Sequence, residues 1–262
     1  MTAFELNQQL KHLIPVLPER TVDRVIYGDP RVQVKGIAVA WMPYRETIVE
    51  AARRGANVLV VHEPTFYDHW DLQGDFQSDE QTEAKKQLID SLGVTIVRCH
   101  DVWDVVPDMG IPFAWGAFLE LGRPVTVDRY YHMCEVPEQT ALAFARHVAS
   151  KTAELGQPSV GFYGDPDRVV RKIGIGTSCG SDPFALYALG ADLAIAVDDI
   201  VRAWVAGEWC RDSGRPLFVV NHGVSEEPGM AALAGYLAAT FPGLPVTHIR
   251  QRCSFVSVGA AG

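Results

Sequence analysis

Two observations predict an α/β protein with two similar lobes: a strand–helix–strand pattern that occurs twice, and apolar strands that end on polar residues. The first copy of the pattern spans residues 34–63, and the second spans residues 170–199. In each copy a Gly-Ala pair, beginning at Gly55 or Gly190, stands where a helix should stop and the next strand should begin. Because such a unit joins parallel strands through a helix, this weak internal repeat predicts mixed sheets covered by helices.

The remaining elements continue the alternation of helices and strands. Helices are expected at residues 1–17, 80–92, 115–122, 137–154 and 230–241, and strands at 94–99, 130–136, 216–220 and 245–249. Residues 159–175 are expected to form two strands around a Gly-Asp-Pro-Asp turn at 164–167. Pro137 is expected to open the fourth of these helices. We place the first lobe at residues 1–128 and the second at 129–262, with residues from about 215 to 262 as candidates to pack on the first lobe.

The bulk composition excludes several classes of protein. The chain has 262 residues, of which 48% are hydrophobic, and no apolar stretch reaches the roughly 18 residues of a membrane span. The net charge of −9 makes nucleic acid an unexpected partner, since nucleic-acid binding needs a basic face. The five cysteines are scattered and never in CxxC spacing, so we expect neither a disulfide framework nor a zinc knuckle, and a cytoplasmic location fits.

Four apolar strands end on residues that can bind metals or transfer protons. The residues at these ends are His62 and Glu63; His100, Asp101 and Asp104; Asp198 and Asp199; and Asn221, His222 and Glu226. Ligand sites of parallel α/β sheets form beyond the carboxyl ends of the strands, so these side chains are expected in one crevice. Imidazole and carboxylate together suit zinc, iron, manganese or nickel. The alternative is that each histidine has a purely structural role.

The stretch NHGVSEEPG places acidic residues near a predicted helix start. If Ser225 caps a helix that begins near Pro228, Glu226 lies at the positive end of that helix and can bind a cation across from His222. The alternative is that Glu226 and Glu227 only stabilise the helix dipole. For Asp198 and Asp199, capping of a helix from Ile200 is the corresponding alternative.

At this point the motifs resemble those of a known family. The three motifs are H-E-P at residues 62–64, H-x-x-x-D at 100–104 and H-x-x-S-E at 222–226. A fourth is the predicted hairpin and glycine turn GDPDRVVRKIGIGTSCG at residues 164–180. In this order they resemble the NIF-three-like (NGG-one-interacting factor three-like) family, whose members are often labelled type 2 homologues of GTP cyclohydrolase I. The likeness runs from about residue 5 to residue 255.

The resemblance implies two α/β lobes with a two-metal site between them, and a ring-shaped homohexamer built from trimers. The metal ligands that it implies are His62, Asp104, His222 and Glu226, with His100 beside the metals. The family usually has a second histidine where this chain has Glu63. Glu63 then becomes a further oxygen ligand, and the site holds one or two divalent transition-metal ions.

Two kinds of function remain open. The first is a metal-dependent hydrolase of an unknown small molecule, in which His100 or Glu227 serves as the general base. The second is a non-catalytic metal-binding protein, or an oligomeric scaffold or regulatory protein. An open coordination position would favour the hydrolase, and a closed ligand set would favour a structural role.

Overall fold

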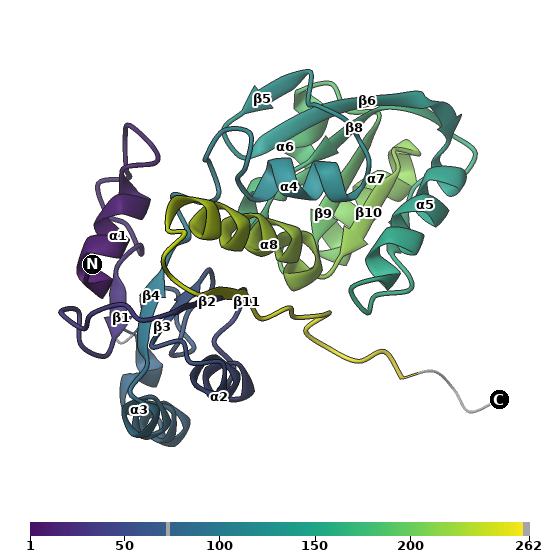
Figure 1. Ribbon diagram of the computed structural model, residues 1–262. Coiled ribbons are helices and arrows are strands. Elements are labelled where there is room, and N and C mark those ends of the chain that lie inside the picture. The colour runs from purple at the N-terminus through teal and green to yellow at the C-terminus, as the bar shows by residue number, and fades with distance from the viewer. Residues whose placement is uncertain (72–73, 259–262) are drawn as a thin grey trace. The chain divides into compact units, whose positions relative to one another are not determined.

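A computed structural model describes residues 1–71 and 74–258, and the chain is an α/β protein with two mixed sheets covered by helices (Figure 1). The chain divides into two compact units. The first unit comprises Met1–Gly110 and Met230–Gln251, and the second comprises Ile111–Gly229 and the segment from Arg252 onward. Each unit contains one sheet.

The first unit has a five-stranded sheet in the order β1-β4-β3-β2-β11. Its elements are α1 (Ala3–Lys11), β1 (Val25–Tyr27), β2 (Ile37–Ala40), α2 (Arg45–Arg53), β3 (Val58–Val61), η1 (Asp75–Ser78), α3 (Glu80–Leu92), β4 (Thr95–Arg98) and β11 (Val246–His248). Strands β11, β2, β3 and β4 are parallel, whereas β1 runs antiparallel to β4. All residues of β2, β3 and β4 are buried, as expected for parallel strands covered on both faces.

The second unit has a six-stranded sheet in the order β5-β6-β8-β9-β10-β7. Its elements are α4 (Ile111–Phe118), β5 (Thr126–Asp128), β6 (Tyr131–Thr140), α5 (Ala141–Ala153), β7 (Gly161–Tyr163), β8 (Val169–Ile175), η2 (Ser178–Ser181), α6 (Pro183–Ala188), β9 (Leu193–Val197), η3 (Ala203–Gly207), α7 (Glu208–Ser213) and β10 (Leu217–Val220). Helix α8 (His222–Thr240) begins in this unit, and its residues from Met230 belong to the first unit.

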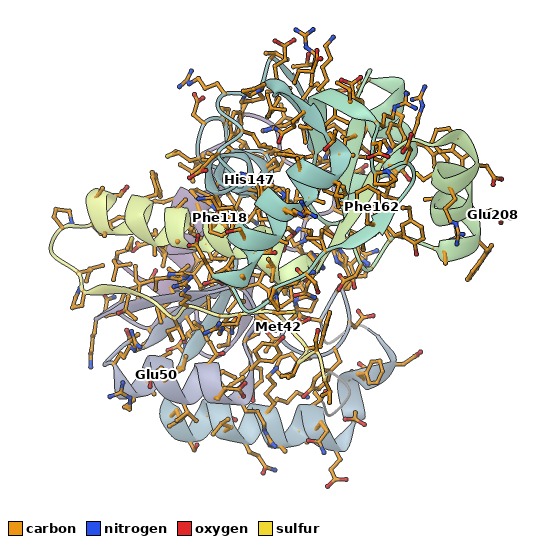
Figure 2. The ribbon with its side chains drawn as sticks, turned by 90° about the vertical axis from the view of Figure 1, so that its right-hand side faces the viewer. Met42, Glu50, Phe118, His147, Phe162 and Glu208 are labelled. Atoms are coloured by element: carbon orange, nitrogen blue, oxygen red, sulfur yellow. The ribbon has the colours of Figure 1, made fainter. Side chains whose placement is uncertain are left out.

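Residues 111–128 belong to the second unit, although the sequence analysis placed them in the first lobe. Trp115 and Leu119 explain this, because they share a buried apolar cluster with Cys134 and Phe144 of the second unit. Figure 2 labels Phe118 and Phe162, two partly buried rings that pack against the same cluster.

The internal repeat is visible in the topology. The first copy folds as β2-α2-β3 and the second as β8, η2, α6 and β9, and each copy pairs its two strands in parallel. A third parallel strand, β4 or β10, follows beside each pair, and an antiparallel strand, β1 or β7, lies beyond it. Gly55 and Gly190 both have positive φ, of 79° and 97°, which explains the glycine at these turns.

Two predicted helix starts were wrong, because interactions distant in sequence set the helix boundaries. The helix predicted to begin at Pro137 begins at Ala141: β6 continues to Thr140 along β8, and the Thr140 side chain caps the helix by accepting from Ala143 N–H. Helix α8 begins at His222 and contains Pro228, because the Asp198 carboxylate at the end of β9 accepts the His222 N–H at 2.9 Å.

No helix in the described part of the chain is both long and apolar enough to cross a membrane. Cys99, Cys134, Cys210 and Cys253, the cysteines whose side chains are described, are free.

A histidine of β6 is buried in an apolar environment. The His132 side chain is almost fully buried, its ring lies 4.3 Å from that of Phe113, and its Nδ1 has no hydrogen-bond partner in the described part of the chain. Burial lowers the pKa of His132 from 6.5 to about 4. Because the unfolded chain binds this proton more tightly, His132 favours unfolding as the pH falls from 6.5 towards 4.

We therefore expect His132→Gln to lose less stability in acid than the wild type. The full difference amounts to about 3 kcal/mol of unfolding free energy between pH 7 and pH 4, from the size of the pKa shift. Urea midpoints at both pH values measure it, with His12→Gln, at an exposed histidine, as the control. Equal acid losses in His132→Gln and wild type would show that His132 does not titrate in this way.

Candidate metal centre

The first candidate ligand, His62, follows β3 at the carboxyl end of the first unit's sheet and is fully buried. Its Nδ1 donates to the carbonyl oxygen of Cys99 at 3.2 Å, and its Nε2 lies 3.4 Å from Asp104 Oδ1. A histidine with one nitrogen fixed by a carbonyl presents the other nitrogen in a defined direction, as metal-binding histidines do.

His100 and Asp104 follow the neighbouring parallel strand, β4. The rings of His100 and His62 stack with centroids 4.4 Å apart. The Nδ1 of His100 lies 3.0 Å from Asp101 Oδ1 and 3.6 Å from Asp104 Oδ2. A turn in which Asp104 N–H donates to the His100 carbonyl at 2.9 Å brings these two side chains together.

A buried carboxylate, Asp23, fixes this turn. Its two oxygens accept the backbone N–H groups of His100, Asp101 and Val102 at 2.6, 3.1 and 2.8 Å. Burial raises the pKa of Asp23, and the N–H donors oppose that shift. No local sequence pattern identifies Asp23 as part of the site, because it lies more than 70 residues from its partners in the chain.

The ligand atoms of His62, His100 and Asp104 all lie within 4.8 Å of one another. Asp104 Oδ1 is buried and accepts no hydrogen bond from the described residues. Two imidazole nitrogens and a carboxylate oxygen at this spacing match the donors that zinc, iron and manganese take in proteins. The first unit therefore has a residue group that can hold a divalent metal ion.

Arg98, the last residue of β4, holds the end of β3 beside the loop that follows it. Its side chain is fully buried and donates from Nε to the His62 carbonyl at 2.8 Å and from Nη1 to the His69 carbonyl at 2.5 Å. Its guanidinium also lies 3.5 Å from Asp71 Oδ2 and 3.9 Å from Glu63 Oε2. Arg98 was not predicted as part of the site, and its only sequence signal is an arginine inside an apolar strand.

Two more buried charges fix the loop from Pro64 to Asp71. Asp71 accepts from the backbone N–H groups of Thr65 and Phe66 at 2.6 and 2.9 Å, and Lys85 donates to the Thr65 carbonyl at 2.7 Å. Burial raises the pKa of Asp71 and lowers that of Lys85 to about 8. The loop is thus tied to α3 and β4 through buried polar groups, which are costly to separate.

A pocket of about 360 Å³ lies beyond the ends of β2 and β3, beside this metal-binding group. Its lining includes Met42, Tyr44 and Tyr67 as apolar walls and Glu63, His69 and Lys85 as polar groups. The His69 ring meets the His100 ring edge-on at 5.6 Å, and burial lowers the pKa of His69. The pocket is large enough for a small organic molecule next to the candidate metal ligands.

The second unit holds its own histidine–carboxylate group at the end of β10. His222 Nδ1 lies 2.8 Å from Asp199 Oδ2, and its Nε2 lies 2.9 Å from Glu226 Oε1. Glu226 is fully buried and accepts from the Thr177 hydroxyl at 2.5 Å. The hydrogen bond from His222 lowers the pKa of Asp199.

Asp198 and Asp199 contact His222 and do not cap a helix from Ile200. Asp198 accepts the His222 N–H, Asp199 contacts the ring, and the next helical turn starts only at Ala203. The two units therefore carry matching features: a histidine after the third parallel strand and an acid four residues later, as His100 and Asp104 or His222 and Glu226.

The predicted site residues thus fall into two groups. The structure brings His62, His100 and Asp104 together in the first unit, and His222 and Glu226 in the second. Glu63 lines the pocket, and its Oε2 lies 3.9 Å from the Arg98 guanidinium. Glu227, a predicted general base, is buried in α8 beside Glu226 in sequence.

We expect Arg98→Met to destabilise the protein and to loosen the loop at residues 63–71. The substitution leaves the Asp71 carboxylate and two backbone carbonyls without their buried partner, which costs about 3–5 kcal/mol in comparable cases. Urea denaturation measures the loss, and hydrogen exchange of the peptide covering this loop should become faster. The control, Arg53→Met, removes an exposed ion pair with Glu50 and should leave both measurements nearly unchanged. If the loop in Arg98→Met exchanges hydrogen at the wild-type rate, Arg98 does not hold the loop in place.

Comparison with solved structures shows where this fold occurs. The chain is similar to Staphylococcus aureus protein SA1388, with 18% identity over 98% of this chain and 99% of that chain and a TM-score of 0.81. A Bacillus cereus protein related to NIF3 gives 14% identity, coverage of 98% and 99%, and a TM-score of 0.78. Reduced HcgD from Methanocaldococcus jannaschii shares 15% identity over 97% of this chain and 98% of that chain, with a TM-score of 0.69. At these identities the likeness concerns the fold.

The sequence itself gives the family. No protein with a curated description matches it. The family model described as Duf34/NIF3 (NGG1p interacting factor 3) matches residues 1–253, which is nearly the whole chain. The chain therefore belongs to the Duf34/NIF3 family.

Proposed function

We propose that this protein binds one or two divalent transition-metal ions and hydrolyses an unknown small molecule. The observation that carries the proposal is the group of His62, His100 and Asp104, whose ligand atoms lie within 4.8 Å of one another beside a pocket of about 360 Å³. A bound ion of this kind polarises a substrate oxygen and lowers the pKa of a water molecule.

In the first unit the proposed ligands are His62 and Asp104, and His100 lies beside the ion without binding it. The motif resemblance adds His222 and Glu226, and Glu63 is the further oxygen donor in place of the family's second histidine. Zinc, iron, manganese and nickel all accept this mixture of imidazole and carboxylate ligands. The number of ions then depends on whether Glu63 completes a second site.

His100 is the proposed general base, and Glu227 is the alternative. The Asp101 carboxylate, 3.0 Å from His100 Nδ1, favours a proton on that nitrogen and leaves Nε2 as the proton acceptor. The same carboxylate stabilises the imidazolium that forms when His100 takes a proton. Burial and a hydrogen bond from His100 act in opposite directions on Asp101, and its pKa lies below the usual value.

A second candidate function is non-catalytic metal binding, in a scaffold or regulatory protein. The burial of His62 and Asp104 favours it, because a ligand set closed to solvent is typical of structural sites. The scattered cysteines support a cytoplasmic location for either function, since thiols stay reduced there.

The proposal predicts one or two equivalents of transition metal in the purified protein, because the ligand set can complete one or two sites. His62→Ala and His222→Ala should each lose metal, whereas His12→Ala, at an exposed histidine, should not. Elemental mass spectrometry measures the metal content. A protein that binds no metal even after reconstitution would refute the proposal.

For the catalytic part of the proposal, His100→Gln should keep the fold and lose hydrolysis of nitrophenyl esters or phosphates.

The proposal also includes a homohexamer, which rests on the motif resemblance alone. Light scattering should give a mass of six times the 28.8 kDa chain. A monomeric mass over the whole range of accessible concentrations would refute this part and leave the metal centre of the first unit unaffected.

A further inference from the structure

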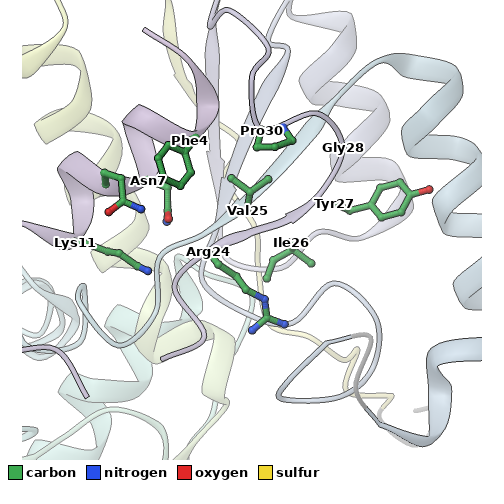
Figure 3. Close-up of a pocket in the computed structure, with 10 residues that line it drawn as sticks. Phe4, Asn7, Lys11, Arg24, Val25, Ile26, Tyr27, Gly28 and Pro30 are labelled. Carbon is green, nitrogen blue, oxygen red and sulfur yellow. The ribbon is translucent and has the colours of Figure 1, made fainter. Parts of the chain in front are cut away.

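A groove of about 300 Å³ lies between α1 and β1 in the first unit (Figure 3). One wall is a single face of α1, formed by residues at helical spacing: Phe4, Asn7, Gln8 and Lys11. The other wall is five consecutive residues, 24–28, which include all of β1. The groove therefore follows the strand along its length.

Strand β1 is at the edge of its sheet. It pairs antiparallel with β4 on one side, and no other strand in the described part of the chain lies on its second side. An edge strand presents backbone donors and acceptors on which another extended chain can pair. The groove gives such a chain space beside β1.

The amide side chain of Asn7 lacks a partner. Asn7 is 3% exposed, and its Nδ2 makes no hydrogen bond with any residue that the structure describes. A buried donor left without an acceptor costs about 1–3 kcal/mol. A carbonyl oxygen placed in the groove would satisfy it, and the Gln8 amide one residue further along offers a second set of polar atoms.

The charge of the groove is opposite to that of the whole chain. Lys11 and Arg24 line it, and no acidic residue is among its described lining residues, although the chain carries a net charge of −9. Arg24 Nη2 donates to the Trp70 carbonyl at 2.6 Å, which fixes the guanidinium in place. Neither cation has an acidic partner within the lining, although Arg24 also interacts with the Asp71 carboxylate outside it, and the two favour a ligand that brings carboxylates.

We propose that this groove binds an extended acidic peptide segment, which adds a strand to the free edge of β1. Strand addition supplies the backbone hydrogen bonds, Asn7 takes a peptide carbonyl, and Lys11 and Arg24 pair with carboxylates of the ligand. The continuous run of backbone along one wall favours a peptide over a compact acid, which would contact only one end of it. This inference does not depend on the proposed hydrolase.

The test uses the full-length protein and a fluorescein-labelled peptide, Val-Glu-Val-Glu-Val, followed by fluorescence anisotropy. Lys11→Glu should weaken binding by about tenfold or more, since it replaces an attraction with a repulsion. Lys35→Glu, the same change at an exposed lysine outside the groove, should stay within about twofold of wild type. Asn7→Leu should also weaken binding, and circular dichroism checks that each variant is folded.

Several outcomes would overturn the proposal. Equal binding of Val-Lys-Val-Lys-Val would show that charge is not recognised, and equal binding of a peptide with a central proline would exclude pairing with β1. Competition by succinate as strong as by the unlabelled peptide would identify a small-acid site. No peptide binding, together with self-association that Lys11→Glu abolishes, would identify a second copy of the chain as the occupant.

Discussion

The candidate metal centre depends on the hydrogen bonds that the buried Arg98 guanidinium donates to two backbone carbonyls. Arg98 stands at the end of β4 and binds the carbonyls of His62 and His69, so the end of β3 and the following loop are held by one side chain. Removing such a charge from water is costly, and the two carbonyls and the carboxylates of Asp71 and Glu63 offset that cost. His62 can then be buried with its Nε2 directed at Asp104 instead of into solvent.

The topology explains why ligand-type residues occur at matching places in the two units. Both sheets place three parallel strands side by side in chain order, so that their carboxyl ends meet at one edge. In both units a histidine follows the third strand, and a carboxylate, of Asp104 or Glu226, lies four residues later. The units differ after the second strand: His62 lies there in the first, and Asp198 in the second, where it binds the backbone of His222. The same order of three parallel strands therefore places a histidine–carboxylate pair in each unit, with different neighbouring residues.

The sequence was sufficient for the features that arise from local patterns. The apolar runs predicted the parallel strands, and the Gly-Ala turns predicted the repeat. The polar residues at the strand ends predicted that His62, His100 and Asp104 lie close together. Long-range contacts decided the rest. Asp23 and Arg98 have no local signature, since their partners are far away in the chain or on a loop of irregular conformation. The starts at Pro137 and Pro228 failed for the same reason, because pairing with β8 and capping by Asp198 overrode the local preference of proline.

The groove and the metal-binding group share one short segment of chain. Asp23, which holds the N–H groups of residues 100–102, immediately precedes Arg24, and the Arg24 carbonyl accepts the N–H of Arg98 at 2.9 Å. A ligand that orders β1 therefore acts on the same backbone that positions His100 and Arg98. Binding free energies are reciprocal, so any effect of such a ligand on metal affinity must equal the effect of the metal on that ligand. The size of that coupling depends on how rigidly Asp23 already holds the turn. Because the buried Asp23 carboxylate accepts three hydrogen bonds from the turn, we expect the coupling to be small.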